Sequence, residues 1–167
     1  MREIEFRAFV KETRKMKKVV SVDFILKKIE IWLGIQMKIL EFDEVELMQF
    51  TGIKGYTREG SEEQGVYQGD SITIFQESLP AGYYLEEYIT GIVDLDETGT
   101  AFIIKNAKIE SLNENIPRND GDMEISLNVP SDEDLKEVFL HHFDLTPDDV
   151  TINGNIHDNP ELLEEAK

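Results

Sequence analysis

Apolar residues alternate with polar ones along several segments of this chain, and this period-two pattern constrains the fold more than any other feature. Its strictest occurrence is residues 29–39, where every second side chain is apolar. A helix over these residues would leave several isoleucines off its apolar stripe and would place Gly34 in its interior. The β-branched content also favours a strand. The pattern therefore predicts extended structure from Ile29 to Ile39.

The remaining strand signals are short, and turn residues separate them. The basic run Lys11–Lys15 turns the chain, Gly52 ends a strand, and residues 55–65 form a loop rich in Gly and Glu. Apolar segments on either side of Asp94–Gly99 predict a hairpin. The expected strands cover residues 4–8, 20–26, 47–51, 71–75, 88–93 and 101–104. Many short strands of this kind predict a mixed sheet or a small barrel.

The pattern changes after Ile125, where helix signals begin. Ser131 can cap a helix that runs to about Phe143. Pro147 begins a further turn, and Asn159 caps a short C-terminal helix. The apolar stripe of the first helix consists of Leu135, Val138, Phe139 and His142. The sequence as a whole thus predicts an α+β protein that is mainly β, with short helices near its C-terminus.

The chain of 167 residues is predicted to form one domain, 1–167, in which residues 109–149 are an acidic insertion or sub-domain. It contains no cysteine, which excludes disulfides, thiol catalysis and thiolate metal sites. The charged N-terminal residues do not have the pattern of a signal peptide. No apolar run approaches the ~20 residues that span a bilayer. We therefore expect a cytoplasmic protein without a membrane partner.

A net charge of −18 disfavours direct binding to nucleic acid, because phosphate contacts depend on clustered Lys and Arg. The charge is uneven: residues 11–18 are strongly basic, whereas the half after Tyr83 is strongly acidic. The basic run is either a solvated turn or an electrostatic partner for the acidic half of a neighbouring subunit. Residues 19–40 are rich in aliphatic side chains for one face of one small sheet, which predicts a homo-oligomer.

The acidic loops do not complete a metal site. Asp94–Gly99 begins like a calcium loop, but position 12 is Lys105, where a bidentate glutamate is required. Asn119–Asp122 gathers carboxylates without the remaining ligands. A plain turn explains both segments. The sequence therefore predicts no metal and no cofactor.

The three histidines favour structural roles. His142 lies on the predicted apolar stripe, where a packed ring is expected, and His141 is expected to be exposed. Adjacent helical residues point about 100° apart, so these two cannot hold one ion along a helix face. Another bulky residue would serve equally at His157, which argues against catalysis. The nucleophile-elbow, phosphate-binding and zinc-protease motifs are all missing, so no catalytic residue is assigned.

Four short blocks in a fixed order frame the chain. They are REIEFRA at 2–8, LMQFTGIK at 47–54, VYQGDSI at 66–72 and NGNIHDNPEL at 153–162. Together they resemble the YopX family, small proteins encoded mainly by phages and prophages of Gram-positive bacteria. The resemblance implies an origin more than a reaction, because that family has no established biochemical activity.

The resemblance singles out nine residues, and we interpret them as structural. Gly52 and Gly69 suit strand ends that need a positive φ. Asp70 can accept hydrogen bonds from amides in its own turn. Gln49 and Thr51 are expected to join a buried polar network. The full set is Gln49, Thr51, Gly52, Gly69, Asp70, Gly154, Asn155, Asn159 and Pro160.

The sequence favours a phage or prophage accessory protein that is non-enzymatic and acts through protein–protein contacts or self-assembly. Its partners would be copies of itself and a host or phage protein. Two alternatives stand beside this interpretation: an acidic nucleic-acid mimic that blocks a host DNA-binding protein, and an enzyme of unrecognised class. A carboxylate array on one face would support the mimic. A pocket that gathers His157 with carboxylates would support the enzyme.

Overall fold

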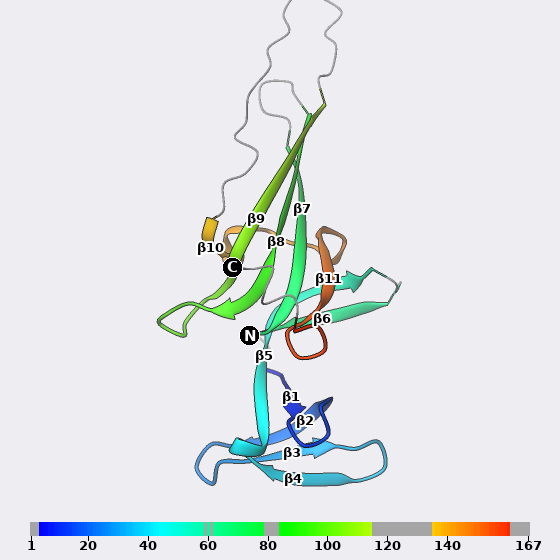
Figure 1. The fold of residues 1–167 in the computed structure, drawn as a ribbon, viewed down its shortest axis with the longest axis vertical. Helices are drawn as coiled ribbons and strands as arrows, with labels where there is room; N and C mark the ends of the chain where they lie inside the picture. The colour runs from blue at the N-terminus through cyan, green and yellow to red at the C-terminus, as the bar shows by residue number, and fades with distance from the viewer. Residues whose placement is uncertain (1–3, 59, 61, 79–83, 115–134, 161–167) are drawn as a thin grey trace, which may run out of the picture.

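The computed structural model describes residues 4–58, 60, 62–78, 84–114 and 135–160. Its strands form one open sheet in the order β10-β9-β8-β7-β11-β5-β1-β2-β3-β4, with β6 paired to β5 off this path (Figure 1). The sheet is mixed, because β11 runs parallel to β5 and the other pairs are antiparallel. The strands are β1 (Phe6–Val10), β2 (Lys15–Asp23), β3 (Lys28–Trp32), β4 (Met37–Glu41), β5 (Val45–Thr57), β6 (Glu63–Tyr67), β7 (Asp70–Ser78), β8 (Tyr84–Leu95), β9 (Phe102–Glu114), β10 (Leu135–Phe139) and β11 (Val150–Asn155).

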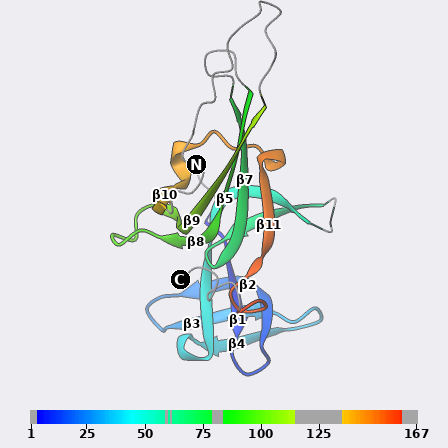
Figure 2. The same cartoon turned by 45° about the horizontal axis from the view of Figure 1, so that its top comes forward.

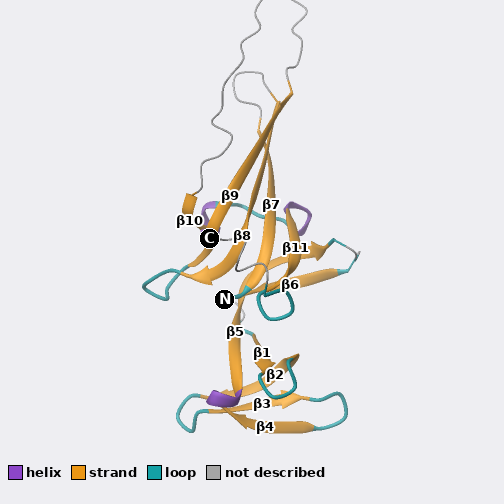
Figure 3. Ribbon diagram, in the orientation of Figure 1, coloured by secondary structure: helices purple, strands orange, loops and turns teal. Residues whose placement is uncertain are grey.

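This open mixed sheet confirms the prediction of a mainly β protein. The barrel alternative is wrong, because the two end strands of the sheet, β10 and β4, do not pair with each other. Helical residues in the described part of the chain are confined to single 3-10 turns, drawn in purple in Figure 3. These turns are η1 (Phe42–Glu44), η3 (Leu140–His142) and η4 (Pro147–Asp149).

The N-terminal strands form a small lobe, residues 4–49, in the lower part of Figure 1. Here β1 lies between β2 and β5, and β2, β3 and β4 follow one another in the sheet. Residues 11–14 make the turn between β1 and β2, as the basic run predicted. The buried apolar side chains of this lobe form a core of their own: Ala8, Val10, Ile29, Ile31, Leu40 and Val45.

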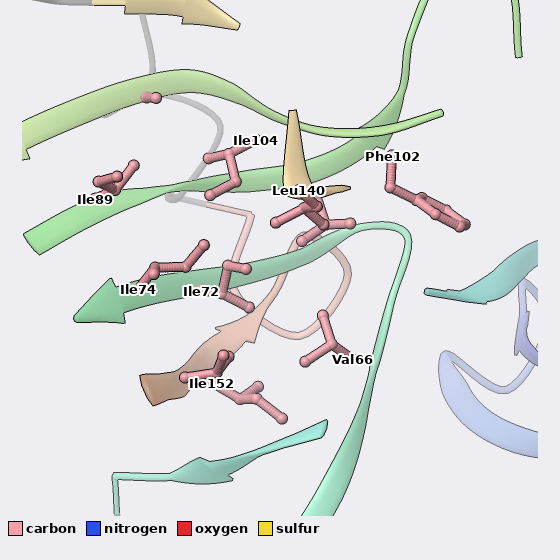
Figure 4. Close-up of a cluster of buried hydrophobic side chains, with 11 residues drawn as sticks. Val66, Ile72, Ile74, Ile89, Phe102, Ile104, Leu140 and Ile152 are labelled. Carbon is pink, nitrogen blue, oxygen red and sulfur yellow. The ribbon is translucent and has the colours of Figure 1, made fainter. Parts of the chain in front are cut away.

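A second and larger core lies in residues 50–155, the large lobe. Its side chains converge from β6, β7, β8, β9, β11 and the neighbouring turn η3 (Figure 4). Each isoleucine that is fully buried in this way contributes roughly 1.5–3 kcal/mol relative to an exposed one. The buried members are Val66, Ile72, Ile74, Ile89, Val93, Phe102, Ile104, Ala107, Leu140, Val150 and Ile152.

Strand β5 belongs to both lobes and joins them, as the turned view in Figure 2 shows. Residues 45–49 pair with β1, whereas residues 50–56 pair with β6. The pairing with β6 is irregular between Phe50 and Lys54, and within that interval Gly52 has a φ of 86°. One continuous strand therefore passes from the first core into the second.

Strand β11 lies between β7 and β5, antiparallel to the first and parallel to the second. Thr151 is opposite Tyr56 of β5 and Thr73 of β7. The approach to β5 is close: a Cβ on Gly55 would lie 2.5 Å from the carbonyl oxygen of Val150. Only a residue without a side chain fits at this point of the sheet.

The predicted helix that ends near Phe143 is wrong in its described part. Leu135–Phe139 is strand β10, with Leu135 opposite Ala107 and Val138 opposite Ile104 of β9. The residues that follow form only the 3-10 turn η3. A short apolar segment fits either a strand or a helix, and pairing along the edge of β9 decides in favour of the strand. The proposed start at Ser131 lies outside the described residues.

The other helix predictions have mixed outcomes. The turn at Pro147 is confirmed as the single 3-10 turn η4, which Thr146 and Asp149 close with a capping box. The helix expected after Asn159 falls mostly on residues 161–167, outside the described part. Of the segment 109–149, residues 109–114 belong to β9 and residues 135–149 to β10, η3 and η4.

The alternation over residues 29–39 predicted extended structure correctly, but it did not show the turn inside it. A turn about Gly34, whose φ is 97°, separates β3 from β4. Across this turn the alternation changes face: Ile29 and Ile31 are buried, whereas Met37 and Ile39 are exposed. The loop expected at 55–65 is also shorter, because β5 extends to Thr57 and β6 begins at Glu63.

Candidate functional site

A buried ion pair between Arg7 and Asp70 fastens the small lobe to the large one. Asp70 is the first residue of β7 and is only 1% exposed. Its Oδ1 accepts a hydrogen bond from Nη2 of Arg7, and its Oδ2 accepts one from the backbone N–H of Tyr67 at 2.8 Å. Donors from the protein therefore engage both oxygens of this carboxylate.

Several side chains hold the guanidinium of Arg7 in place. Its Nε donates to Sδ of Met48 at 3.3 Å, and its central carbon lies 4.7 Å from the centre of the Tyr67 ring. That ring attracts a cation through its π face. The Tyr67 hydroxyl in turn donates to Glu5 at 3.3 Å. Residues from β1, β5 and β6 therefore converge on the first residue of β7.

Burial raises the pKa of Asp70 above its usual value, and the neighbouring Arg7 guanidinium opposes this shift. Burial also raises the pKa of Tyr67, and the carboxylate of Glu5 adds to the effect. A perturbed pKa can mark a reactive group, but structural ion-pair networks perturb pKa values as well. The complete hydrogen bonding of Asp70 favours the structural interpretation here.

The Gly69 backbone links this ion pair to the fourth signature block, residues 153–162. Gly69 has a φ of 85°, and its N–H donates to Val93 while its carbonyl accepts from Ile156. A non-glycine residue is strained at such a φ. Next to it in the sheet, Asn155 of β11 is opposite Asp70. The third and fourth signature blocks therefore meet at the Arg7–Asp70 pair.

Asn155 organises the turn that follows β11. Its Oδ1 accepts the backbone N–H groups of His157 and Asp158, each at 3.0 Å. Its Nδ2 donates to the carboxylate of Asp158, and its carbonyl accepts from the N–H of Asn159. Asn155 and Asn159 therefore shape the turn, while Pro160 is exposed at its end. These contacts support the structural role proposed for the block.

His157 packs against the small lobe. Its ring stacks on Phe9 with centroids 4.2 Å apart, and its Nε2 lies 3.6 Å from a carboxylate oxygen of Glu46. Burial lowers the pKa of His157, which the charge of Glu46 opposes. His157 meets one carboxylate in this way and lines neither of the two cavities described below. This geometry is that of a packed ring between lobes.

The residues at 49–52 support the path of β5. The carbonyl of Gln49 accepts from the N–H of Gln68 at 3.0 Å. The buried hydroxyl of Thr51 donates to the carbonyl of Val66 at 2.9 Å and accepts from the N–H of Ile53 at 3.0 Å. These bonds lie at the irregular stretch of β5 that contains Gly52. No buried side-chain nitrogen or oxygen among the described residues lacks a hydrogen-bond partner.

Sequence reasoning missed three members of this cluster: Arg7, Met48 and Phe9. Arg7 looked like one more charged residue in an alternating strand, and nothing local identifies a partner 63 positions further along the chain. The signal that could have found it is the presence of Arg7 in the first signature block and Asp70 in the third. A buried Asp requires a cation, and the blocks offer few.

The other candidate residues remain separate from this cluster. Asp96 uses its carboxylate within the hairpin turn, where it accepts from Thr98, Thr100 and Ala101. His141 and His142 are both exposed, so the packed ring expected at His142 is wrong. Asn119–Asp122 lies outside the described residues. No group of three or more His, Asp or Glu side chains in the described part of the chain is arranged to hold a metal ion.

A different kind of surface lies on the small lobe, where large apolar side chains are exposed. Among the described residues, every large hydrophobic side chain of this kind falls within residues 4–39. Exposed apolar side chains gathered in one part of a chain are candidates for a contact surface. The exposed side chains are Ile4, Val20, Phe24, Ile25, Leu26, Trp32, Ile35, Met37 and Ile39. We call them the apolar surface of the small lobe.

Two hollows are lined by residues that the structure describes. One, with a volume of about 740 Å³, is lined by Ile4, Val20 and Phe24 of the apolar surface, and by Lys17 and Lys18. The other, of about 580 Å³, lies between the irregular stretch of β5, the β8–β9 turn and η3. Both are open to solvent, and neither gathers a set of catalytic groups.

Charge follows the division into lobes. The first 49 residues carry 10 basic and 9 acidic side chains, whereas residues 50–167 carry 7 basic and 26 acidic ones. The small lobe is therefore close to neutral, and nearly all the negative charge belongs to the rest of the chain. The apolar surface thus occurs where electrostatic repulsion between two copies is weakest.

The fold and its cluster define a mainly β protein with two cores, one shared strand and a buried ion pair between lobes. No helix in the described part of the chain is long and apolar enough to cross a membrane. The family model described as YopX protein matches residues 5–164, so the chain belongs to the YopX family, as the four blocks predicted. No curated protein and no solved structure matches the chain significantly.

Proposed function

We propose that the protein is a non-enzymatic accessory factor of phage or prophage type that acts through protein–protein contacts, first of all with copies of itself. YopX family membership supports the phage-type origin. We also propose the cytoplasm of a bacterial host as its compartment and a host or phage protein as a further partner. Both proposals rest on that membership.

The observation that carries the proposal is the apolar surface of the small lobe. Exposed apolar area is removed from water on association, which contributes roughly 25 cal/mol per Å². The most conspicuous members are Ile25 and Ile35, which are 92% and 90% exposed, together with a tryptophan, Trp32. Trp is among the residues that contribute most at protein interfaces. The signature cluster, by contrast, is occupied with its own contacts.

Light scattering at micromolar concentration tests the proposal. The expected mass is at least twice the 19.2 kDa of one chain. A mass of one chain across the whole concentration range would refute contact between copies. A variant with Trp32→Ser and Ile35→Ser should lose mass, whereas the exposed-charge variant Glu97→Ser in the large lobe should not.

A nucleic-acid mimic remains the second candidate, and the charge of residues 50–167 favours it. Glu77 of β7 and Glu86 of β8 lie directly opposite each other, an arrangement of like charges that costs stability. Displacement of a purified basic nucleoid protein from duplex DNA would support the mimic. The double variant Glu77→Gln, Glu86→Gln should then displace less. No displacement by micromolar protein would rule it out.

A further inference from the structure

Strand β4 is the last strand at the small-lobe end of the sheet. It pairs with β3 on one side, and no described strand pairs with its other side. An edge of this kind presents unpaired backbone N–H and C=O groups, which can pair with another chain. The edge is therefore a candidate for the contact between copies that the proposed function requires.

Hydrogen bonds at the two ends of the β3–β4 pair fix which residues of β4 face the free edge. The N–H of Leu33 donates to Gln36 at 2.9 Å, and that of Phe42 donates to Lys27 at 3.0 Å. Pairs in an antiparallel ladder alternate between hydrogen-bonded and non-hydrogen-bonded. Lys38 and Leu40 therefore bond to β3. The backbone groups that point outward are those of Met37, Ile39 and Glu41.

The same three residues also place their side chains on the solvent side of the small lobe. Met37 and Ile39 are 54% and 63% exposed, and Trp32 stands opposite Met37 on the neighbouring strand. Leu40, which has the other orientation, is buried in the core. The free edge and the apolar surface of the small lobe thus adjoin each other.

We propose that two copies of the chain pair through β4, antiparallel, about a two-fold axis that passes beside Ile39. This inference rests on the proposed function, since it names the copy-to-copy contact. Ile39 then faces Ile39 of the second copy, and Met37 faces Glu41 in both directions. Each of these pairs exchanges both backbone hydrogen bonds, because all three residues point outward. The two sheets become one.

Other two-fold registers are poorer. In any such dimer, outward-facing residues must lie opposite outward-facing residues. At least two of the three outward residues of β4 find partners only when the two-fold axis passes beside Lys38, Ile39 or Leu40. An axis beside Lys38 sets two like charges directly opposite each other, which is destabilising. An axis beside Leu40 leaves Met37 without a partner. The register about Ile39 alone uses every outward group of the strand.

Two features of the small lobe permit this approach. Lys on an edge strand usually discourages pairing, but Lys38 lies 3.8 Å from Glu12 of its own chain and turns away from the outward side chains. The near-neutral charge of the first 49 residues also limits repulsion. In Figure 1, β4 lies at the end of the molecule opposite the tips of β7–β9, so pairing keeps the acidic lobes apart.

A single engineered cysteine tests the register, because the chain has none of its own. Ile39→Cys should form a disulfide-linked dimer under mild oxidation, since paired Cα atoms ~5.5 Å apart fall within disulfide range. Thr98→Cys is the control: its side chain is exposed in the β8–β9 turn of the large lobe, so it should not become disulfide-linked. Equal cross-linking of the two variants, or faster cross-linking of Lys38→Cys, would overturn the register.

The charge variant Ile39→Lys supplies an independent measurement, with Thr98→Lys in the exposed β8–β9 turn as its control. Light scattering should give one-chain mass for Ile39→Lys and wild-type mass for Thr98→Lys, while both keep the wild-type circular dichroism. Wild-type protein that is monomeric contradicts the proposed function itself. Wild-type protein that associates, with neither Ile39 variant altering mass or cross-linking, refutes only the pairing through β4.

Discussion

At the scale of single residues, the Arg7–Asp70 pair is the strongest constraint on how the lobes meet. A buried carboxylate must have partners, and here they come from β1 and from its own turn. Removing one member of such a pair leaves the other charge uncompensated, which usually destabilises a fold by 3–5 kcal/mol. Substitutions at this pair therefore test whether its role is structural or catalytic.

We expect Asp70→Ala to lower the free energy of unfolding by about 3 kcal/mol, the low end of that range because Arg7 keeps some access to solvent. Asp70→Asn retains an acceptor for the Tyr67 N–H and should cost less. Gly69→Val should cost about 1–3 kcal/mol, because its backbone φ is positive. Urea melts of the three variants beside wild type measure these differences.

The exposed Asp144 supplies the control, since Asp144→Ala should melt with wild type. In the double variant Arg7→Ala, Asp70→Ala, the loss of unfolding free energy should be smaller than the sum of the two single losses, because the two side chains act as one unit. Unchanged midpoints for both Gly69→Val and Asp70→Ala would contradict the structural role. The block would then be the first place to look for a reactive site.

His157 predicts how stability depends on pH. Burial lowers its pKa in the folded protein below the ordinary 6.5, so the unfolded chain binds a proton first as the pH falls. Stability should therefore decrease on acidification, beginning near 6.5 and ending below the folded pKa. His157→Phe should remove this part of the decrease. Urea melts of wild type and His157→Phe at about pH 7.5 and about pH 5.5 measure this effect. The contribution of His157 is the pH-dependent change in wild type minus the change in the variant.

Other groups titrate in the same range, so the comparison needs a matched histidine. His141 is exposed, so His141→Phe is the matched control for the loss of a histidine. An equal pH dependence in wild type and His157→Phe would show that the stacked ring does not couple protonation to folding.

At the scale of the elements, the irregular stretch of β5 depends on one hydroxyl. The Thr51 hydroxyl donates to the carbonyl of Val66 and accepts from the N–H of Ile53. Replacement by Val, which has a similar shape, removes the hydroxyl as a partner of both backbone groups. We expect Thr51→Val to lower the free energy of unfolding by about 1–3 kcal/mol. Thr13→Val, in the exposed β1–β2 turn, should have little effect. Equal denaturation midpoints would show that water replaces the lost bonds.

Strands with strict alternation could be predicted from sequence, because one face of each is buried and the other exposed. This held for Ile72 and Ile74, which are both buried as their spacing implied. It failed at Leu135–Phe139, since a five-residue segment carries too little periodicity to distinguish a strand from a helix. Only the edge of β9, far away in sequence, decides that case.

The candidate site could be predicted only in its local parts. The positive φ of Gly69 and the amide bond of Asp70 follow from the turn itself. The pairing with Arg7 and the stacking of His157 on Phe9 depend on strands from opposite ends of the chain. The sequence also did not show that Met37 and Ile39 are exposed. Their orientation depends on the turn about Gly34, which lies inside the alternating run 29–39.

At the scale of the whole molecule, the uneven charge predicts the effect of salt on association. Pairing through β4 involves apolar side chains and backbone groups, while the acidic lobes repel. Raising the ionic strength from about 20 mM to about 500 mM should therefore strengthen the dimer, because screening weakens repulsion. Contact between the basic run 11–18 and a neighbouring acidic lobe predicts the opposite. Light scattering across a dilution series at each salt concentration separates the two.

Ile39→Lys serves as the control for that experiment, since it should have one-chain mass at every salt concentration. A wild-type dimer that dissociates as salt rises would show that attraction between unlike charges holds the copies together. The copies would then meet through the basic turn rather than through the edge of β4.

The place of β11 in the sheet also sets an order of events during synthesis on the ribosome. The strands of the small lobe are contiguous and can pair as soon as residue 49 has emerged. β5 and β7, however, are not connected in the sheet until residues 150–155 have been synthesised, because β11 lies between them and pairs with both. Pairings between such distant segments form slowly. Until residues 150–155 emerge, the nascent chain therefore carries a paired small lobe beside an incomplete large lobe.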